Sequence, residues 1–250
     1  MHRQEVREKV WKTLRTIAKP DSRFHFDFNE YIPDFEGSDI ATQKLIEMEC
    51  YQQAQTIFIT PDNCLELFRA QTFRDQKTQI MSTYGIRRGL VELTPKEAPV
   101  ELADYIVQLD LIEKVGHSIS LKALRQKHHL DLVVTGGSVV NYQGVRFGKG
   151  HGFFDLEWAF LYMLGVVDVN TPVIAFVHDC QVIDIKLDIS PFDTVCDYII
   201  TPTQVIHVQT PQKPETGVIW DCLNEGMFES IPPLQEIKIM QDDGDLNSGF

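Results

Sequence analysis

The sequence lacks the long apolar runs and the positive charge that mark two large classes of protein. No run approaches the roughly 18 consecutive apolar residues of a membrane-spanning helix. The N-terminal residues are polar and charged, so we expect no signal peptide. The formal net charge of −13 argues against a surface built mainly to bind nucleic acid. We therefore expect neither a membrane nor a nucleic acid as a partner.

Cysteine pairs are also missing. The five cysteines are scattered, and none belongs to a Cys-x-x-Cys pair, so we expect neither a structural zinc site nor a disulfide framework. This usage favours the reducing cytoplasm. There is no internal repeat or low-complexity segment, and 43% of the residues are hydrophobic, which is typical of a folded protein. The 250 residues suffice for one large α/β domain or two small ones.

Apolar spacing predicts the secondary structure of the first half. Helices are expected over residues 3–17, 38–54, 63–74, 98–107 and 117–127, and strands over 56–60 and 78–82. Pro20 ends the first helix, and Ser38 is a plausible N-cap of the second. The stretch 24–37 is expected to be an extended connection.

Strand and helix patterns alternate more clearly in the second half. Strands are expected over residues 130–135, 172–177, 198–201 and 205–208, with a helix over 153–164. This alternation predicts a three-layer αβα domain with a mostly parallel central sheet, and ligands at the C-terminal strand ends. After Thr210 the composition becomes rich in proline and then acidic. We therefore expect a single domain over 1–210 and a partly ordered tail over 211–250.

One stretch between an apolar run and a helix pattern is rich in glycine. It contains Gly144, Gly148, Gly150 and Gly152, the cations Arg146 and Lys149, and the carboxylate Asp155. Glycine lets backbone N–H groups approach an anion, and the following helix adds a favourable dipole. Arg146 and Lys149 would neutralise phosphate charge, and Asp155 would hold a magnesium ion. The alternative is a glycine-rich turn with incidental charges.

The stretch resembles the G-x-R-x-G-x-G-x-G-Y-Y-D loop of the 5-formyltetrahydrofolate cyclo-ligase family, also called methenyltetrahydrofolate synthetases. Residues 172–182 and 192–201 are similar to further segments of that family. Upstream, Arg3 and Arg7 have the four-residue spacing of a family Lys and Arg pair. The resemblance covers about residues 3–210 and is strongest over 130–205.

The resemblance implies a fold of the NagB/RpiA/CoA-transferase-like type and an ATP- and magnesium-dependent ligase. The family phosphorylates the formyl oxygen of 5-formyltetrahydrofolate and closes a ring to give 5,10-methenyltetrahydrofolate. By position, Asp155 and Asp193 would serve the metal, and Arg146 and Lys149 would act in catalysis. The residues implied to contact ATP are Arg3, Arg7, Arg146, Phe147, Gly148, Lys149, Gly150, His151, Gly152, Phe153 and Phe154.

This sequence departs from the family pattern mainly in the half that holds the substrate. Phe153 and Phe154 replace the Tyr-Tyr pair, and Phe192 replaces a histidine. The family holds its folate with an E-x-x-T segment, which residues 35–42 do not reproduce. Their F-x-G-S form is closer to the divergent branch of methenyltetrahydrofolate synthetase domain-containing proteins. The expected partner is a small molecule, with a reduced folate first. The alternatives are another small heterocycle used with ATP, or a nucleotide- or folate-binding protein without catalysis.

Overall fold

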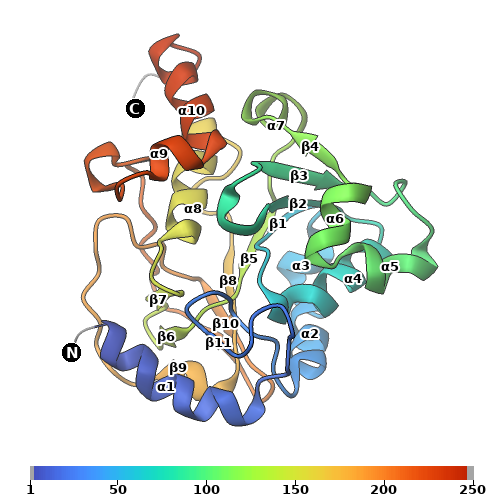
Figure 1. Cartoon of the computed structure of the whole chain (residues 1–250), viewed down its shortest axis with the longest axis vertical. Helices are drawn as coiled ribbons and strands as arrows, with labels where there is room; N and C mark the ends of the chain where they lie inside the picture. The colour runs from blue at the N-terminus through green and yellow to red at the C-terminus, as the bar shows by residue number, and fades with distance from the viewer. Residues whose placement is uncertain (1–2, 247–250) are drawn as a thin grey trace.

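The computed structural model describes residues 3–246, which form an α/β fold with an eight-stranded sheet (Figure 1). The strand order is β11-β10-β8-β5-β1-β2-β3-β4. The strands are β1 (Thr56–Ile59), β2 (Thr78–Ser82), β3 (Leu90–Leu93), β4 (His117–Ile119), β5 (Leu132–Thr135), β8 (Val173–Phe176), β10 (Tyr198–Ile200) and β11 (Val205–His207). The five strands from β10 to β2 are parallel, and the other three pair antiparallel at the edges. The predicted mostly parallel sheet is confirmed.

Helices cover both faces of this sheet. They are α1 (Arg3–Ile17), α2 (Ser38–Ile46), α3 (Glu49–Gln53), α4 (Glu66–Arg74), α5 (Ala103–Ile106), α6 (Leu109–Val115), α7 (Leu121–Lys127), α8 (Phe153–Leu164), α9 (Met227–Ser230) and α10 (Pro232–Asp242). A second sheet has the order β7-β6-β9, with β6 (Val139–Asn141), β7 (Arg146–Phe147) and β9 (Val182–Ile183).

Successive side chains of a central strand enter different cores, as the two-residue period of a strand requires. In β1, Ile57 and Ile59 pack with α2, α3 and α4, whereas Phe58 packs with α8 on the other face. All four residues of β1 are buried, because both faces of the sheet are covered. The three-layer arrangement predicted from the sequence is therefore confirmed.

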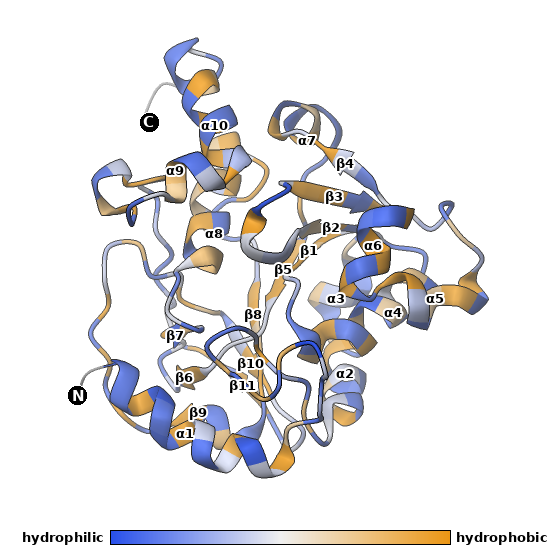
Figure 2. Cartoon of the chain, in the orientation of Figure 1, coloured by the Kyte–Doolittle hydropathy of each residue, from blue (hydrophilic) through white to orange (hydrophobic). Residues whose placement is uncertain are grey.

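Helix α8 has the bounds predicted for it and follows the glycine loop, residues 148–152. It begins after Gly152 and ends at Gly165, both in the left-handed region, where glycine is favoured. Figure 2 shows that α8 is mostly hydrophobic, whereas α1 carries hydrophobic and polar residues in alternation. This difference arises because α8 is packed between the sheet and α10. Only one face of α1 is buried, and its other face is exposed to solvent.

Two expected helices of the first half were partly wrong. The helix expected over 38–54 is broken between α2 and α3, and Gly37 rather than Ser38 is the N-cap of α2. The first residues of the helix expected over 117–127 form β4, because they pair with β3. Ser120 then caps α7 by accepting a hydrogen bond from the backbone N–H of Ala123.

The segment after Thr210 contains a helix that the sequence pattern did not predict. Leu234, Ile237 and Met240 of α10 are buried and belong to the same hydrophobic core as α8. In Figure 1, α10 and α9 lie beside the upper part of α8. None of the helices in residues 3–246 combines the length and hydropathy needed to cross a bilayer.

Candidate functional site

The glycine loop joins β7 to the N-terminus of α8. Gly150 has φ 121° and Gly152 has φ 71°, values that residues with side chains rarely adopt. No side chain caps the start of α8, so the amides of its first turn face the loop without a side-chain acceptor. A helix of this length that begins in a glycine loop is suited to an anionic ligand.

A cleft of about 690 Å³ lies on one side of the loop. Arg3 and Arg7, four residues apart on one face of α1, reach into it. The Arg7 Nε donates a hydrogen bond to the carbonyl of Gly148 at 2.7 Å. Both guanidinium groups lie over the ring of Phe147, at 5.5 Å for Arg3 and 5.0 Å for Arg7. The cation pair predicted to contact a nucleotide is therefore brought to the loop.

Asp193 is held by Arg3. The Arg3 guanidinium donates two hydrogen bonds to the Asp193 carboxylate, and the backbone N–H of Ser190 donates a third at 2.7 Å. The Asp193 side chain is only 1% exposed, and it lines neither cavity beside the loop. Its contacts thus neutralise and fix it, and it orients Arg3 toward the cleft.

Asp155, by contrast, lines the cavities on both sides of the loop. Its Oδ1 accepts a hydrogen bond from the backbone N–H of Thr194 at 2.9 Å. Burial raises the pKa of Asp155 to about 6, although nearby Arg146 acts in the opposite direction. A buried carboxyl group with this environment is suited to a cation that enters with a ligand.

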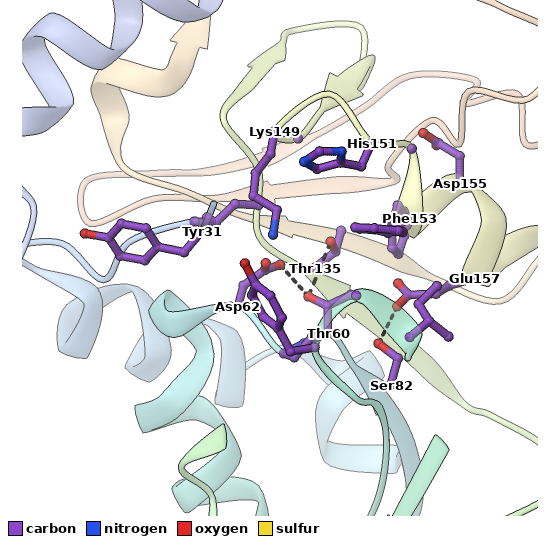
Figure 3. A pocket seen from close by; sticks show the side chains of 18 of the residues that line it. Tyr31, Thr60, Asp62, Ser82, Thr135, Lys149, His151, Phe153, Asp155 and Glu157 are labelled. Carbon is purple, nitrogen blue, oxygen red and sulfur yellow. Dashed lines mark hydrogen bonds between the residues drawn. The ribbon is translucent and has the colours of Figure 1, made fainter. Parts of the chain in front are cut away.

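A smaller cavity of about 60 Å³ lies on the other side of the loop (Figure 3). Lys149 lines it and donates from Nζ to the carbonyl of Glu30 at 2.8 Å. The same Nζ lies 4.8 Å from the ring centre of Tyr84, and burial lowers the pKa of Lys149. The Lys149 side chain therefore lines this cavity, with its ammonium group held by Glu30 and Tyr84.

Arg146 lines the same cavity from β7. Its Nε donates to the carbonyl of Gly136 at 2.7 Å, and its guanidinium lies 4.5 Å from the ring centre of Phe154. The family resemblance implies that all four cations contact ATP. The structure places Arg146 and Lys149 at one cavity and Arg3 and Arg7 at the other, with the glycine loop between them.

The remaining predicted residues divide between the cavities. The larger cleft is lined by Arg3, Arg7, Phe147 and Gly150; the smaller cavity by Arg146, Lys149, Phe153 and Phe154; and both by Gly148, His151, Gly152 and Asp155. Phe192, which replaces a family histidine, lies at the larger cleft.

Two acidic side chains in the smaller cavity were missed by the sequence analysis. Glu157 accepts a hydrogen bond from the Ser82 hydroxyl, and burial raises its pKa to about 8. Asp62 accepts hydrogen bonds from the hydroxyl of Thr60 at 2.6 Å and the backbone N–H of Gly136 at 3.0 Å. One signal was available for each. Glu157 is a carboxyl group among the apolar residues of α8, and Asp62 is a carboxyl group just after the C-terminal end of β1.

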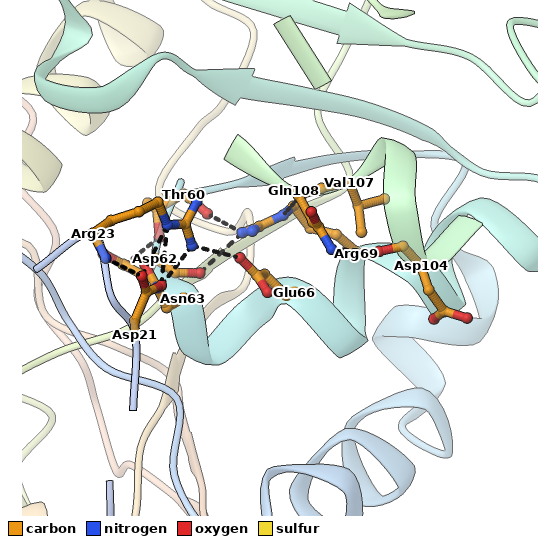
Figure 4. A network of polar contacts seen from close by, with 10 residues as sticks. All are labelled: Asp21, Arg23, Thr60, Asp62, Asn63, Glu66, Arg69, Asp104, Val107 and Gln108. Carbon is orange, nitrogen blue, oxygen red and sulfur yellow. Dashed lines mark hydrogen bonds and ion pairs between the residues drawn. The ribbon is translucent and has the colours of Figure 1, made fainter. Parts of the chain in front are cut away.

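A buried arginine fixes the wall that carries Asp62 (Figure 4). Arg69 is fully buried, and its Nη1 donates to the carbonyls of Thr60 and Asp62, each at 3.0 Å. Its Nε donates to the carbonyl of Val107 at 3.1 Å. The backbone at Thr60–Asp62 is therefore held from behind, which fixes the direction of the Asp62 side chain.

Residues 35–42 lie outside both cavities. Phe35 is buried against the rings of Phe176 and His178, at centroid distances of 5.7 and 5.6 Å. The hydroxyl of Thr42 donates to the carbonyl of Ser38 within α2. The contacts of this segment are therefore packing contacts within the fold. The polar groups of the smaller cavity come from other elements.

The protein side chains alone offer too few ligands for a magnesium ion, so the ion fits this site only when phosphates bind with it. Within residues 3–246, no three His, Cys, Asp or Glu side chains are placed to hold a metal ion together. Magnesium commonly binds one or two carboxylates and completes its shell with phosphate oxygens and water. Asp155 meets that requirement, whereas the Asp193 carboxylate already pairs with Arg3.

Residues 1–202 match the model of the 5-formyltetrahydrofolate cyclo-ligase family. The chain belongs to this family. It is 31% identical over 244 residues to the methenyltetrahydrofolate synthase domain-containing protein of Homo sapiens, covering 94% of this chain and 61% of the relative. The protein of that name from Danio rerio is 31% identical over 242 residues, covering 96% and 62%. The resemblance drawn from the glycine loop, including the branch, is confirmed.

The chain spans less than two thirds of the length of these relatives. The NMR structure of Aquifex aeolicus 5,10-methenyltetrahydrofolate synthetase matches this fold with a TM-score of 0.54 and 15% sequence identity. The match covers 85% of this chain and 96% of that structure. At this identity the likeness shows the cyclo-ligase fold.

Proposed function

We propose that this cyclo-ligase family member uses ATP and magnesium to convert 5-formyltetrahydrofolate into 5,10-methenyltetrahydrofolate through a phosphorylated formyl group. The observation that carries the proposal is the position of one glycine loop between two cavities. Four residues of the loop and of the α8 N-terminus, Gly148, His151, Gly152 and Asp155, line both of them. A group passed from one ligand to the other would cross at this shared wall.

The larger cleft is the donor side in this proposal. Arg3 and Arg7 bind the phosphates as charge-assisted hydrogen-bond donors, and the glycine loop lets backbone N–H groups approach them. Asp155 holds the magnesium ion, whose charge neutralises the phosphate oxygens. Asp193 keeps Arg3 in place through the ion pair. The cleft volume of about 690 Å³ is within the range of small-molecule sites.

The smaller cavity is the acceptor side. Arg146 and Lys149 border it, and they are placed to stabilise negative charge that develops on the oxygens of the transferred group. Asp62, Ser82 and Glu157 supply polar contacts for a heterocycle. With a volume of about 60 Å³, this cavity must widen to admit such a group.

The reaction itself tests the proposal. The purified protein with ATP, magnesium and 5-formyltetrahydrofolate should develop the absorbance of the methenyl product, with one ADP released per product formed. Omission of ATP should abolish the signal. An unchanged spectrum from a protein that binds ATP would reject the folate assignment and leave the donor side in place.

A different acceptor is the second candidate, and the position of residues 35–42 favours it. These residues replace the E-x-x-T segment that the family uses for folate, and none of them lines either of the two cavities beside the glycine loop. Asp62 and Glu157 supply the carboxyl groups of the acceptor side instead. ATP turnover stimulated by another heterocycle, and not by folate, would favour this candidate. Binding of nucleotide or folate without any turnover would indicate a non-catalytic protein.

A further inference from the structure

The larger cleft has two chemically different ends. One end carries Arg3, Arg7 and Asp155 beside the glycine loop. Apolar side chains line the other, with Leu156 and Ala159 from α8 and a wall from residues 217–227. The lining residues Asp155, Leu156 and Ala159 place the cleft along the N-terminal part of α8. In Figure 1, α1 lies below this part of α8, and α9 lies beside the upper part of the helix. The cleft thus continues well past the region suited to phosphates.

The apolar wall is attached firmly to α8. Val218 is buried, and its backbone N–H donates to the sulfur of Met163 at 3.2 Å. The indole N–H of Trp158 donates to the carbonyl of Pro214 at 3.0 Å. Nearby, the buried Lys213 pairs with Asp197 at 2.7 Å. The wall is therefore an ordered part of the cleft rather than a loose tail.

We propose that residues 217–227 bind the base of the nucleotide whose phosphates lie at Arg3 and Arg7. This inference rests on the proposed donor role of the cleft. A nucleoside triphosphate is strongly anionic at one end and flat, with apolar faces, at the other, which matches the two ends of the cleft. Ile219 and Leu223 offer apolar contact, and the amide of Asn224 offers a donor and an acceptor to a base edge.

The wall lies beyond the residues that the family model matches. That match ends at residue 202, whereas the wall begins at Gly217. The phosphate end is thus built from residues within the model, and the base end from a segment that follows it. Discrimination between a nucleotide and a bare polyphosphate is therefore assigned to residues 217–227.

Cys222 provides a direct probe of this end. It lines the cleft and is exposed, so a thiol reagent reaches it in the folded protein. The whole chain is treated with N-ethylmaleimide, and the modification of each cysteine is followed by mass spectrometry. Magnesium with ATP should slow the modification of Cys222 about tenfold or more at saturation, whereas inorganic tripolyphosphate should leave it fast. Cys50, in α3 and outside the cleft, is the internal control.

A pair of neighbouring substitutions supplies the second measurement. Cys222→Trp places a bulky side chain in the cleft, while Asp221→Trp places it on the same turn outside the cleft lining. Cys222→Trp should weaken ATP binding about tenfold and leave tripolyphosphate binding unchanged, and Asp221→Trp should change neither. ATP that binds tightly without protecting Cys222 would overturn this inference and leave the donor role intact. Failure of both ATP and tripolyphosphate to bind would overturn the donor role as well.

Discussion

Arg3 and Asp193 lie 190 positions apart in the sequence and form a two-point ion pair beside the glycine loop. Asp193 is buried, whereas Arg3 is partly exposed to the larger cleft. The pair therefore ties α1 to the loop that precedes β10. We predict that Asp193→Asn weakens triphosphate binding about tenfold, because Arg3 loses its orientation. Titration of the variant with ATP measures this.

A double-mutant cycle separates this role from that of a metal ligand. If Asp193 acts through Arg3, then Asp193→Asn should add little to the loss caused by Arg3→Ala. The loss should also be the same with and without magnesium. Additive losses, with the Asp193 effect present only when magnesium is added, would make Asp193 a metal ligand instead.

Lys149 and Arg7 should affect different steps, because they line different cavities. We predict that Arg7→Ala raises the dissociation constant for ATP about tenfold, since it removes a charge-assisted contact. Lys149→Ala should leave that constant within about a factor of three and lower the turnover number at least tenfold. Binding and steady-state assays on both variants measure the split. Equal losses of ATP affinity would place both cations on the phosphates.

Local sequence patterns predicted those features of the molecule that depend on residues close together in the sequence. The bounds of α8 follow from two glycines and an apolar run, and the proximity of Arg3 and Arg7 to each other follows from the helical period. The side of the loop on which Lys149 lies did not follow, because it depends on the Glu30 carbonyl and the Tyr84 ring.

The acidic and polar residues of the smaller cavity could not be grouped from the sequence either. Asp62, Ser82 and Glu157 come from three separate elements, so only the packing of the sheet against α8 brings them together. Asp193 was grouped with Asp155 from the family pattern alone. Its ion pair with Arg3 requires the approach of α1, which no short-range pattern contains.

The buried carboxyl of Glu157 predicts a dependence of stability on pH. Burial raises its pKa from 4.5 to about 8, while the hydrogen bond from Ser82 acts in the opposite direction. The folded chain thus holds this proton more tightly than the unfolded chain does. Its contribution is greatest below about pH 4.5 and is lost as the pH rises through about 8.

Glu157→Gln should therefore gain stability relative to the parent as the pH rises across that interval, by a few kcal/mol at most. Urea unfolding of the ligand-free proteins at several pH values measures the difference. The exposed Glu36→Gln is the control, and its curve should follow the parent. Parallel curves for Glu157→Gln would show that the group titrates normally.

The two faces of α10 provide a test of how the C-terminal segment supports α8. Leu234 is fully buried against the α8 core, whereas Ile239, on the same helix, is 61% exposed. Leu234→Ala should lower the free energy of unfolding by about 2–5 kcal/mol, because it leaves a cavity beneath α10. Ile239→Ala should change it by less than about 0.5 kcal/mol. Chemical denaturation of both variants measures the contrast. A stability unchanged by Leu234→Ala would mean that α10 contributes nothing to the core.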